Sequence, residues 1–124
     1  MKSKTLTIRP TVATDLHLNN VETFGKSMRG LTVVKGGVPI GVAGVLHTSP
    51  PQAFSVMSDE LREHPKTIVR FIRGFEEFLA KHYSSVVAIA SSKENNAPAC
   101  LVRAGFNFLE YNRDGEEIYQ WQIQ

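Results

Sequence analysis

The chain has 124 residues, and its 42% hydrophobic and 21% charged content is ordinary for one globular domain, which excludes a wholly disordered chain. A total of 14 lysines and arginines against 12 aspartates and glutamates leaves a net charge of +2, too small a surplus to support a nucleic-acid-binding module. No apolar run is long enough to span a membrane, and the N-terminus lacks the apolar core of a secretory signal. The single cysteine, Cys100, cannot form an internal disulfide. We therefore expect one cytoplasmic domain over residues 1–124, with no nucleic-acid or membrane partner.

The first half of the chain predicts four strands. Alternating residues predict a strand over Thr5–Arg9, and β-branched residues predict others over Leu31–Lys35, Val38–Thr48 and Ala53–Met57. The Gly36-Gly37 pair is typical of a two-residue hairpin turn, since glycine tolerates positive φ at both positions. Four strands in succession predict an antiparallel meander.

Two features interrupt this meander. Between the first two strands, Asp15 is expected to cap a short helical or irregular stretch that reaches about Phe24. Within the third strand, Gly41 and Gly44 indicate a bend or a bulge.

The second half of the chain predicts a crossover between strands. Apolar residues between Ile68 and Leu79 recur at helical spacing, and Pro65 fits the first turn of a helix, where its missing N–H is not needed. The run Ser85–Ala90 that follows is apolar on both faces, as in a buried parallel strand. A strand, a helix and a buried strand in this order predict a right-handed βαβ crossover.

The C-terminal part is predicted to add a short helix and a hairpin. The helix covers about Pro98–Ala104 and is stopped by Gly105. Two strands follow, over Phe106–Asn112 and Glu117–Gln122, with the turn at Asp114-Gly115. The predicted fold class is α/β: a single domain with a mixed, mostly antiparallel sheet, one long crossover helix and a short second helix.

Four stretches, which together span nearly the whole chain, carry a resemblance to a known family. They are Thr7-Ile8-Arg9-Pro10 with Asp15, the long helix after the fourth strand, Glu94–Phe106, and Arg113-Asp114-Gly115-Glu116 with Tyr119 and Trp121. In that order they are similar to the opening strand, the CoA-pyrophosphate helix, the "N-x-x-A … G-F" segment and the closing hairpin of the GNAT superfamily of acyl-CoA-dependent N-acetyltransferases. The resemblance implies a GNAT-like fold and acetyl-CoA as the cofactor.

Three shorter segments resemble, more narrowly, a small GNAT-like virion-assembly protein of T-odd short-tailed phages. They are Phe54–Asp59, the long helix from Phe71 to its end at Lys81-His82-Tyr83, and Tyr111–Gly115. This resemblance implies a phage protein in the host cytoplasm or associated with the virion, with host or virion proteins as its partners.

The resemblance places the cofactor's pyrophosphate at the start of the long helix, where the family has R-x-x-G-x-G/A. This chain keeps the arginine as Arg62 and replaces the glycines by Pro65 and Thr67. A helix N-terminus remains an anion site, so we expect Arg62, Lys66 and Thr67 to contact the phosphates. The alternative is a proline-started helix with a solvated first turn and no phosphate.

Further cofactor contacts follow from the same resemblance. Val56, Met57 and Ser58 are expected to present a strand edge to the pantetheine arm, although plain strand packing would produce the same sequence. Asn95 and Asn96 are candidate cofactor contacts, and either one is the expected cap of the short second helix.

Proton transfer is the least supported part of the predicted site. Many family members have a tyrosine four residues before the glycine of the G-F pair, and the residue here is Leu101. No carboxylate lies inside Ala53–Met57, where a general base is often found. Asp59 and Glu60 are therefore the candidate catalytic residues, acting through a water, and the alternative is that both are solvated acids.

Other polar side chains show no catalytic pattern. The four histidines lack metal-ligand spacing, so no metal is expected. His82 ends the apolar face of the long helix and is expected to be packed there, whereas His47, near a strand end, is a weaker candidate for lining a site. Cys100 is expected to be a small buried residue, because no histidine or aspartate motif frames it.

Two functions remain open. The first is an acetyl-CoA-dependent N-acetyltransferase-like phage protein acting on an amine of a host or virion protein, which Arg62 and the asparagine-rich cap favour. The second is a catalytically inactive GNAT-fold virion or assembly component, which Leu101 and the lost glycines favour. A binder of a host factor is a third, less supported hypothesis.

The acceptor and partner surfaces are predicted only in outline. The stretch from Thr11 to Met28 is short for the two helices that GNAT enzymes usually place there, so we expect an open site suited to a macromolecular acceptor. Tyr119 and Trp121 alternate on one face of the terminal strand, where they either cap the core or form a homo-oligomer contact at the sheet edge.

Overall fold

One sheet of seven strands organises the computed structural model, which describes residues 5–90 and 97–123. Its strands are β1 (Leu6–Pro10), β2 (Met28–Lys35), β3 (Val38–Leu46), β4 (Gln52–Met57), β5 (Ser85–Ala90), β6 (Asn107–Tyr111) and β7 (Glu117–Gln122). The helices are α1 (Ala13–Leu18), α2 (Asp59–Arg62), α3 (Pro65–His82) and α4 (Ala97–Arg103). In the order β1-β2-β3-β4-β5-β7-β6, the pair β4 and β5 is parallel and the other pairs are antiparallel. The predicted meander, the crossover helix and the mostly antiparallel α/β sheet are confirmed.

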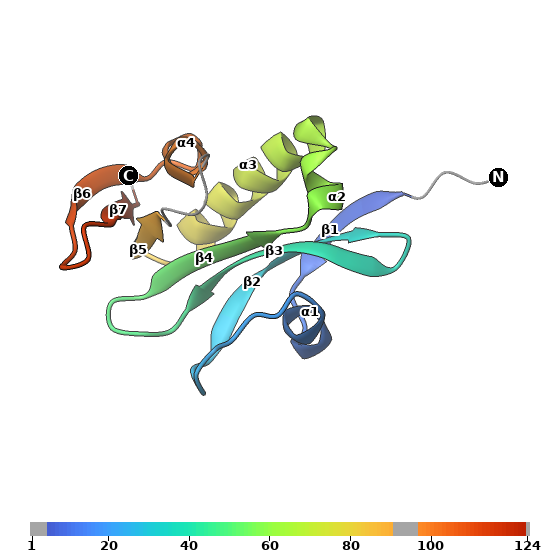
Figure 1. Ribbon diagram of the computed structural model, residues 1–124, viewed down its shortest axis with the longest axis horizontal. Coiled ribbons are helices and arrows are strands. Elements are labelled where there is room, and N and C mark those ends of the chain that lie inside the picture. Colours follow the sequence, from blue (N-terminus) through green and yellow to red (C-terminus); the bar gives the residue numbers. More distant parts are fainter. Residues whose placement is uncertain (1–4, 91–96, 124) are drawn as a thin grey trace.

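The two faces of the sheet carry different helices. α3 crosses one face, with α2 and α4 on the same side, and the short α1 lies on the opposite face (Figure 1). Along α3, the side chains of Phe71, Phe75 and Leu79 recur every fourth residue and are buried. They belong to one core cluster with Val45 and Val86 of the sheet. Burial of each such side chain contributes about 1.5–3 kcal/mol, so this cluster holds α3 on the sheet.

The turn and the bulge of the meander are where the sequence predicts them. The Gly36-Gly37 pair joins β2 to β3 with φ angles of 56° and 83°, values that favour glycine. The pairing of β2 with β3 shifts register between Val33 and Val34, opposite Pro39 and Gly41. The predicted bulge near Gly41 is therefore confirmed.

The ends of the elements differ from the predictions by a few residues. β2 begins at Met28 instead of Leu31, and α4 spans Ala97–Arg103 instead of Pro98–Ala104. Gly105 follows α4 with a φ of 94°, which confirms it as the residue that stops the helix. The sequence does not predict α2, because a helix of four residues is too short to show a helical repeat.

Asp15 stabilises the start of α1 in a different way from the predicted one. The N-cap is Val12, and Asp15 is the third helical residue, where its Oδ2 accepts the N–H of Val12 at 2.9 Å. The same carboxylate accepts two bonds from the Arg9 guanidinium, at 2.7 and 2.9 Å, and one from the Thr32 hydroxyl at 2.9 Å. The Arg9 guanidinium, with the Val12 and Thr32 donors, lowers the pKa of this buried carboxyl to about 2. The Asp15 carboxylate thus ties α1 to β1 and β2.

We expect Asp15→Asn to lower the free energy of unfolding at neutral pH by about 2 kcal/mol, because one pKa unit corresponds to about 1.4 kcal/mol. The folded-state pKa of about 2 lies below the ordinary value of 3.8, so this stabilisation is present above pH 4 and is lost as the pH falls toward 2. Urea unfolding at several pH values measures both effects. The exposed Asp114→Asn is the control, and an equal loss of stability with acid in wild type and Asp15→Asn would contradict the assignment.

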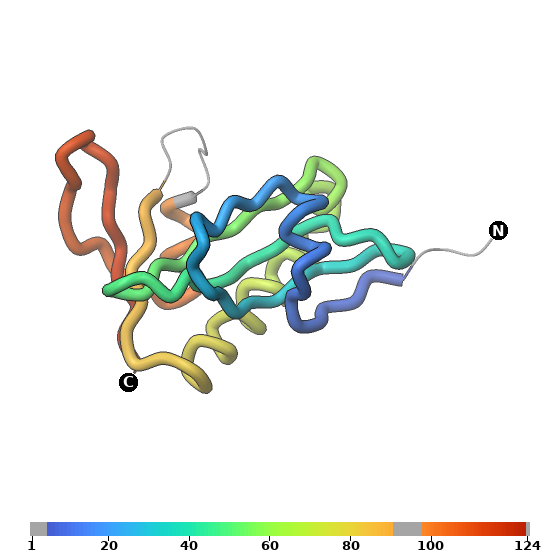
Figure 2. Tube along the Cα trace, turned by 90° about the horizontal axis from the view of Figure 1, so that it is seen from below, coloured from blue at the N-terminus to red at the C-terminus, as the bar shows by residue number. Residues whose placement is uncertain are grey.

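The C-terminal strand is not the edge of the sheet. β7 lies between β5 and β6 and pairs with both. Tyr119 and Trp121 are 6% and 4% exposed and belong to the core, so of the two predicted alternatives the core packing is the correct one. The edge strands are β1 and, at the C-terminal end of the sheet (Figure 2), β6, whose apolar side chains Phe108 and Tyr111 are exposed. Any partner at this end would meet β6 first.

Gly74 lies in the middle of α3, where glycine costs about 1 kcal/mol relative to alanine. A Cβ atom added there would meet the Cδ1 atom of Leu31 at 3.8 Å, an ordinary contact. We expect Gly74→Ala to raise the free energy of unfolding by about 0.5–1 kcal/mol in chemical denaturation. Gly41→Ala is the opposite control, because its Cβ would overlap the Leu61 side chain and should destabilise the fold. A loss of stability in Gly74→Ala would show that the helix needs glycine at this position.

Candidate active site

β4 and β5 begin as neighbours and then separate. Within the described residues, the ladder between them consists of two pairs, Gln52 with Val87 and Ala53 with Ala88. β4 continues to Met57 and β5 continues beyond the last pair to its own end, but neither adds a further pair to this ladder. The sheet therefore has an opening at its centre, on the side where α3 begins.

The backbone groups of alternate β4 residues face this opening. The N–H of Ser58 donates to the carbonyl oxygen of Ile40 at 3.0 Å, and the two-residue repeat of an antiparallel ladder also directs Val56 toward β3. Ser55 and Met57 consequently direct their N–H and C=O groups away from β3, into the opening. Of the three residues predicted to present this edge, Met57 does so, and Val56 and Ser58 pair with β3. Ser55 was missed by the sequence reasoning, because the register of β4 with β3 decides which of its residues face the opening.

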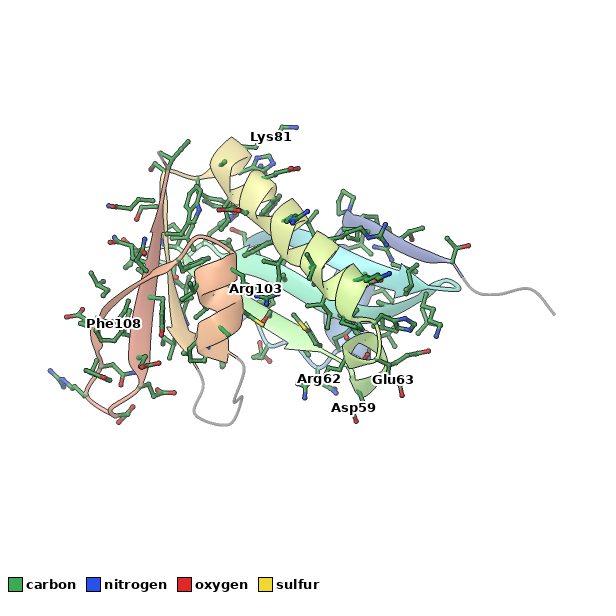
Figure 3. All side chains as sticks on the ribbon, turned by 90° about the horizontal axis from the view of Figure 1, so that it is seen from above. Asp59, Arg62, Glu63, Lys81, Arg103 and Phe108 are labelled. Carbon is green, nitrogen blue, oxygen red and sulfur yellow. The ribbon has the colours of Figure 1, made fainter. Side chains whose placement is uncertain are left out.

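A cavity of about 370 Å³ lies in the opening, beneath α3 and α4. Its lining is mostly apolar and consists of Ala43, Ala53, Phe54, Ser55, Met57, Arg62, Ile68, Phe71, Ile72, Phe75, Ala88, Ile89, Cys100, Leu101, Ala104 and Phe106. The polar side chains among these are those of Ser55, Arg62 and Cys100. Figure 3 shows α3 and α4 side by side above the sheet, with Arg62 at the end of the opening where α2 leads into α3. Such a cavity suits an elongated, largely apolar group with a few polar contacts.

The start of α3 lies next to the cavity: Arg62 and Ile68 line it, whereas Lys66 and Thr67 do not. Pro65 is the first residue of this helix, and the first helical bond joins the N–H of Ile68 to the carbonyl of His64 at 3.0 Å. The N–H groups of Lys66 and Thr67 precede that bond and so have no acceptor within the helix. Together with the positive end of the helix dipole, they favour an anion at this point.

The predicted phosphate-binding side chains are placed differently around this helix start. Arg62 lines the cavity, and the Lys66 side chain is exposed in the first turn of α3. Thr67 is buried, so its hydroxyl is not open to a ligand in solvent. Asn95 and Asn96 lie outside the described residues, and their contacts with a cofactor stay a prediction.

α2 directly precedes the segment from Arg62 to Thr67, where the family resemblance places the glycine-containing loop. The Ser58 hydroxyl caps this helix by accepting the N–H of Leu61 at 3.2 Å, and the Leu61 side chain is fully buried. Asp59 and Glu60 form its first turn, and Glu60 makes a salt bridge of 2.9 Å with the Nζ atom of Lys35. Neither acid lines the cavity. Their predicted catalytic role would therefore need a water to reach it.

The described residues around the cavity offer little for proton transfer. No carboxylate or histidine is among the described side chains that line it. Leu101 does line it, which places an apolar side chain at the position where many family members have tyrosine. Cys100 lines it as well and is half-buried, so this residue is more accessible than the sequence suggested.

None of the four histidines lines the cavity. His47 is exposed, with its Nδ1 atom 2.8 Å from the Ser27 hydroxyl and its Nε2 atom 2.7 Å from the Tyr83 hydroxyl. His82 is also exposed: its ring packs against Phe78 at the end of the helix, with centroids 4.8 Å apart, but outside the core. The described residues contain no cluster of three or more histidine, cysteine, aspartate or glutamate side chains that would hold a metal ion. Among the helices of the described part, none is both long and apolar enough to cross a membrane.

The sequence matches no protein-family model and no curated protein. Solved structures match nearly the whole chain. One is the aminoglycoside acetyltransferase AAC(6')-Ib in complex with coenzyme A and kanamycin, with a TM-score of 0.66 and 16% identity over 97% of this chain and 95% of that one. Another is the ribosomal-protein-S18-alanine N-acetyltransferase from Escherichia coli, with a TM-score of 0.72 and 16% identity over 97% and 95%. The smu.2055 protein from Streptococcus mutans UA159 has a TM-score of 0.69 and 14% identity over 95% and 99%.

These likenesses show that the chain has the GNAT fold, as predicted from the order of its elements. The identities are too low for the comparisons to carry an activity over to this chain, and the phage subgroup is not among the matches described above. The function therefore depends on the site itself.

Proposed function

We propose that this protein binds acetyl-CoA in the cavity between β4 and β5 and is an N-acetyltransferase that modifies an amine of a protein. The observation that carries the proposal is the edge of Ser55 and Met57, which has no β5 partner among the described residues and borders an apolar cavity lined by Arg62 and by Ile68 of α3. A pantetheine arm is elongated and largely apolar, carries amides that need backbone partners, and ends in a pyrophosphate. The arrangement of the described residues fits each of these parts. The coenzyme A in the AAC(6')-Ib structure supports the proposal through the shared fold.

The anionic end of the cofactor would lie at α3. The side chains of Arg62 and Lys66 supply positive charge, and the N–H groups of Lys66 and Thr67 supply donors. Pro65 removes one donor that a glycine would offer. We therefore infer that this site holds phosphate more by side-chain charge than by backbone hydrogen bonds.

The chemistry expected of the described residues is limited to binding and polarisation. Acetyl-CoA supplies an acetyl group activated as a thioester. The N–H groups of Ser55 and Met57 are directed to the opening, where a donor would stabilise negative charge on a carbonyl oxygen. Leu101 has no proton to give a departing thiolate, so in this proposal protons are exchanged with solvent. Asp59 and Glu60 would take part only through a water.

The proposed acceptor is a macromolecule. The stretch between β1 and β2 holds one described helix, α1, and it ends at Leu18. With so little covering structure, the face of the sheet opposite α3 stays open beside β4, where Val56 is 36% exposed. An open surface suits an amine on a protein better than a small metabolite. We propose that this acceptor is a host or virion protein and that the chain is a phage protein of the host cytoplasm or the virion.

A catalytically inactive virion or assembly component is the second candidate. Pro65 and Thr67 at the helix start, and Leu101 in the cavity, are the observations that favour it. In this version the exposed apolar side chains of β6, Phe108 and Tyr111, would provide the contact with partners or with a second copy. The two candidates differ in whether the protein acetylates an amine and whether it remains with intact particles.

We expect acetyl-CoA to raise the melting temperature of the protein, because a ligand that binds only the folded state adds RT ln(1 + [L]/Kd) to the free energy of unfolding. This amounts to about 2.7 kcal/mol at a hundredfold excess over Kd. Differential scanning fluorimetry measures the shift. Arg62→Ala and Lys66→Ala should each reduce it, whereas Arg73→Ala, which removes an exposed charge of α3 outside the cavity, should not. Absence of a shift at millimolar acetyl-CoA would rule out the transferase.

Cys100 gives an independent test, because it is the sole cysteine of the chain and lines the cavity. We expect saturating acetyl-CoA to slow its alkylation by iodoacetamide at least about tenfold, since the bound arm would cover the thiol. Mass spectrometry of the intact protein follows the reaction. Adenosine diphosphate, which lacks the pantetheine arm, is the matched control and should protect little. Equal protection by both ligands, or by neither, would contradict the placement of the arm.

A further inference from the structure

A second hollow lies at the other end of α3, where Lys81 is found in Figure 3. It is an open groove of about 480 Å³ between the start of β2 and the second half of α3, called here the β2–α3 groove. Its lining consists of Pro10, Arg29, Gly30, Leu31, Gly74, Glu77, Phe78, Lys81 and His82. None of these residues lines the cavity between β4 and β5. The groove is therefore separate from the proposed acetyl-CoA site.

Two glycines line the groove, and only one of them is required by the fold. A Cβ atom on Gly30 would lie 2.6 Å from the carbonyl oxygen of Ala43, so the close approach of β2 and β3 needs glycine there. A Cβ atom on Gly74 would find room, with Leu31 at 3.8 Å as its nearest neighbour. Glycine inside a helix lowers stability relative to alanine. No contact within the described chain accounts for Gly74, and its effect on the surface is to keep the floor of the groove open.

The walls of the groove combine apolar surface with positive charge. Leu31 and Phe78 are half-buried and form apolar walls beside Gly74. Arg29 and Lys81 are exposed at the rim, and so is Glu77, the one acid among the described residues that line the groove.

The Arg29 side chain is held in place by its neighbour. Its Nη1 atom lies 2.9 Å from the Nδ1 atom of His82. Because a guanidinium can only donate, Nδ1 of His82 must be the unprotonated acceptor in this bond. The ring of His82 is in turn packed beside Phe78. Arg29 is thereby fixed at the rim, which lowers the entropy lost when it binds an anion.

We propose that the β2–α3 groove binds an acidic segment of a protein partner, with an apolar side chain of that segment over Gly74 and its carboxylates facing Arg29 and Lys81. An apolar side chain is complementary to the apolar floor of the groove, and neighbouring carboxylates are complementary to the cations at its rim. A nucleic acid would use the cations but would leave the apolar floor without a partner, so the groove fits a peptide better. This proposal stands independently of acetyl-CoA binding.

The test is a titration of the full chain, labelled with ¹⁵N, with a short peptide in which one leucine is flanked on both sides by aspartates. We expect the amide signals of Leu31 and Gly74 to shift and to saturate, and the apparent Kd to rise with salt concentration because exposed ion pairs are screened. The same peptide with glycine in place of leucine should bind more weakly. A peptide with lysines in place of the aspartates should not bind.

Variants separate the floor from the rim. In Gly74→Leu, the new side chain fills the floor of the groove, so the peptide should no longer shift the amide signal of Leu31. Because leucine is favoured over glycine inside a helix, the melting temperature should stay at or above that of the wild type. Arg29→Ala and Lys81→Ala should each raise the Kd about two- to fivefold, the range expected for an exposed ion pair. Arg73→Ala is the matched control, because Arg73 is exposed on the same helix but does not line the groove, and it should leave the Kd unchanged.

Three results would overturn the proposal. The first is the absence of saturable shifts at millimolar peptide. The second is an equal loss of affinity in Arg73→Ala and Arg29→Ala, which would reduce the effect to the general charge of α3. The third is tighter binding of a single-stranded oligonucleotide of the same charge with the same dependence on Arg29, which would assign the surface to nucleic acid.

Discussion

The separation of β4 from β5 is the constraint on which the site depends. The two strands share two pairs and then diverge, so that Ser55 and Met57 keep backbone groups with no partner in β5. A closed sheet would satisfy these groups and fill the space with side chains. Here the crossover helix α3 covers the divergence, and its side chains Ile68, Phe71, Ile72 and Phe75 line the cavity. A ligand that offers amides to the open edge is the natural partner of such a sheet.

Binding and chemistry are unequally supported by this site. The cavity, the open edge and the start of α3 together suit a ligand with an apolar arm and an anionic end. For proton transfer, the described lining offers no carboxylate or histidine, and Leu101 occupies the position that would supply a proton. A chain that keeps the binding geometry and lacks the acid is consistent with a slow transferase whose acceptor exchanges protons with water. The same combination of a retained cavity and a missing proton donor is also expected of a GNAT-fold protein that serves as a structural component.

Local patterns were enough to predict the strands and the longer helix α3, although not α2, and long-range pairing decided the details of the site. The run Ser85–Ala90 identified the strand that pairs in parallel with β4, and the Gly36-Gly37 pair identified the hairpin, because each is a signal carried by neighbouring residues. The prediction that this strand is covered on both faces is wrong: Val86, Ala88 and Ala90 are buried, but Ile89 on the other face is exposed. Whether Ser55 or Val56 faces the opening depends on the register with β3, which no local pattern sets. The position of β7 between two strands, and thus the burial of Trp121, follows from how the last hairpin folds back on β5.

Side-chain roles that join distant segments were also beyond the sequence. From the local sequence, Asp15 resembles a helix cap. In the fold, its carboxylate accepts hydrogen bonds from the N–H of Val12, from Arg9 of β1 and from Thr32 of β2. In the same way, His82 continues the apolar spacing of α3 but lies past the edge of the core, where Arg29 binds it. Such residues are assigned by the fold and not by their neighbours in sequence.

The most direct measurement of the central claim is the response of individual β4 amides to acetyl-CoA in a ¹⁵N-labelled sample. We expect the signals of Ser55 and Met57 to move strongly, because their N–H groups face the opening. The signal of Val56, whose backbone pairs with β3, should move little. Shifts that leave Ser55 and Met57 unchanged, or that follow no two-residue alternation along β4, would contradict the placement of the pantetheine arm between the two strands.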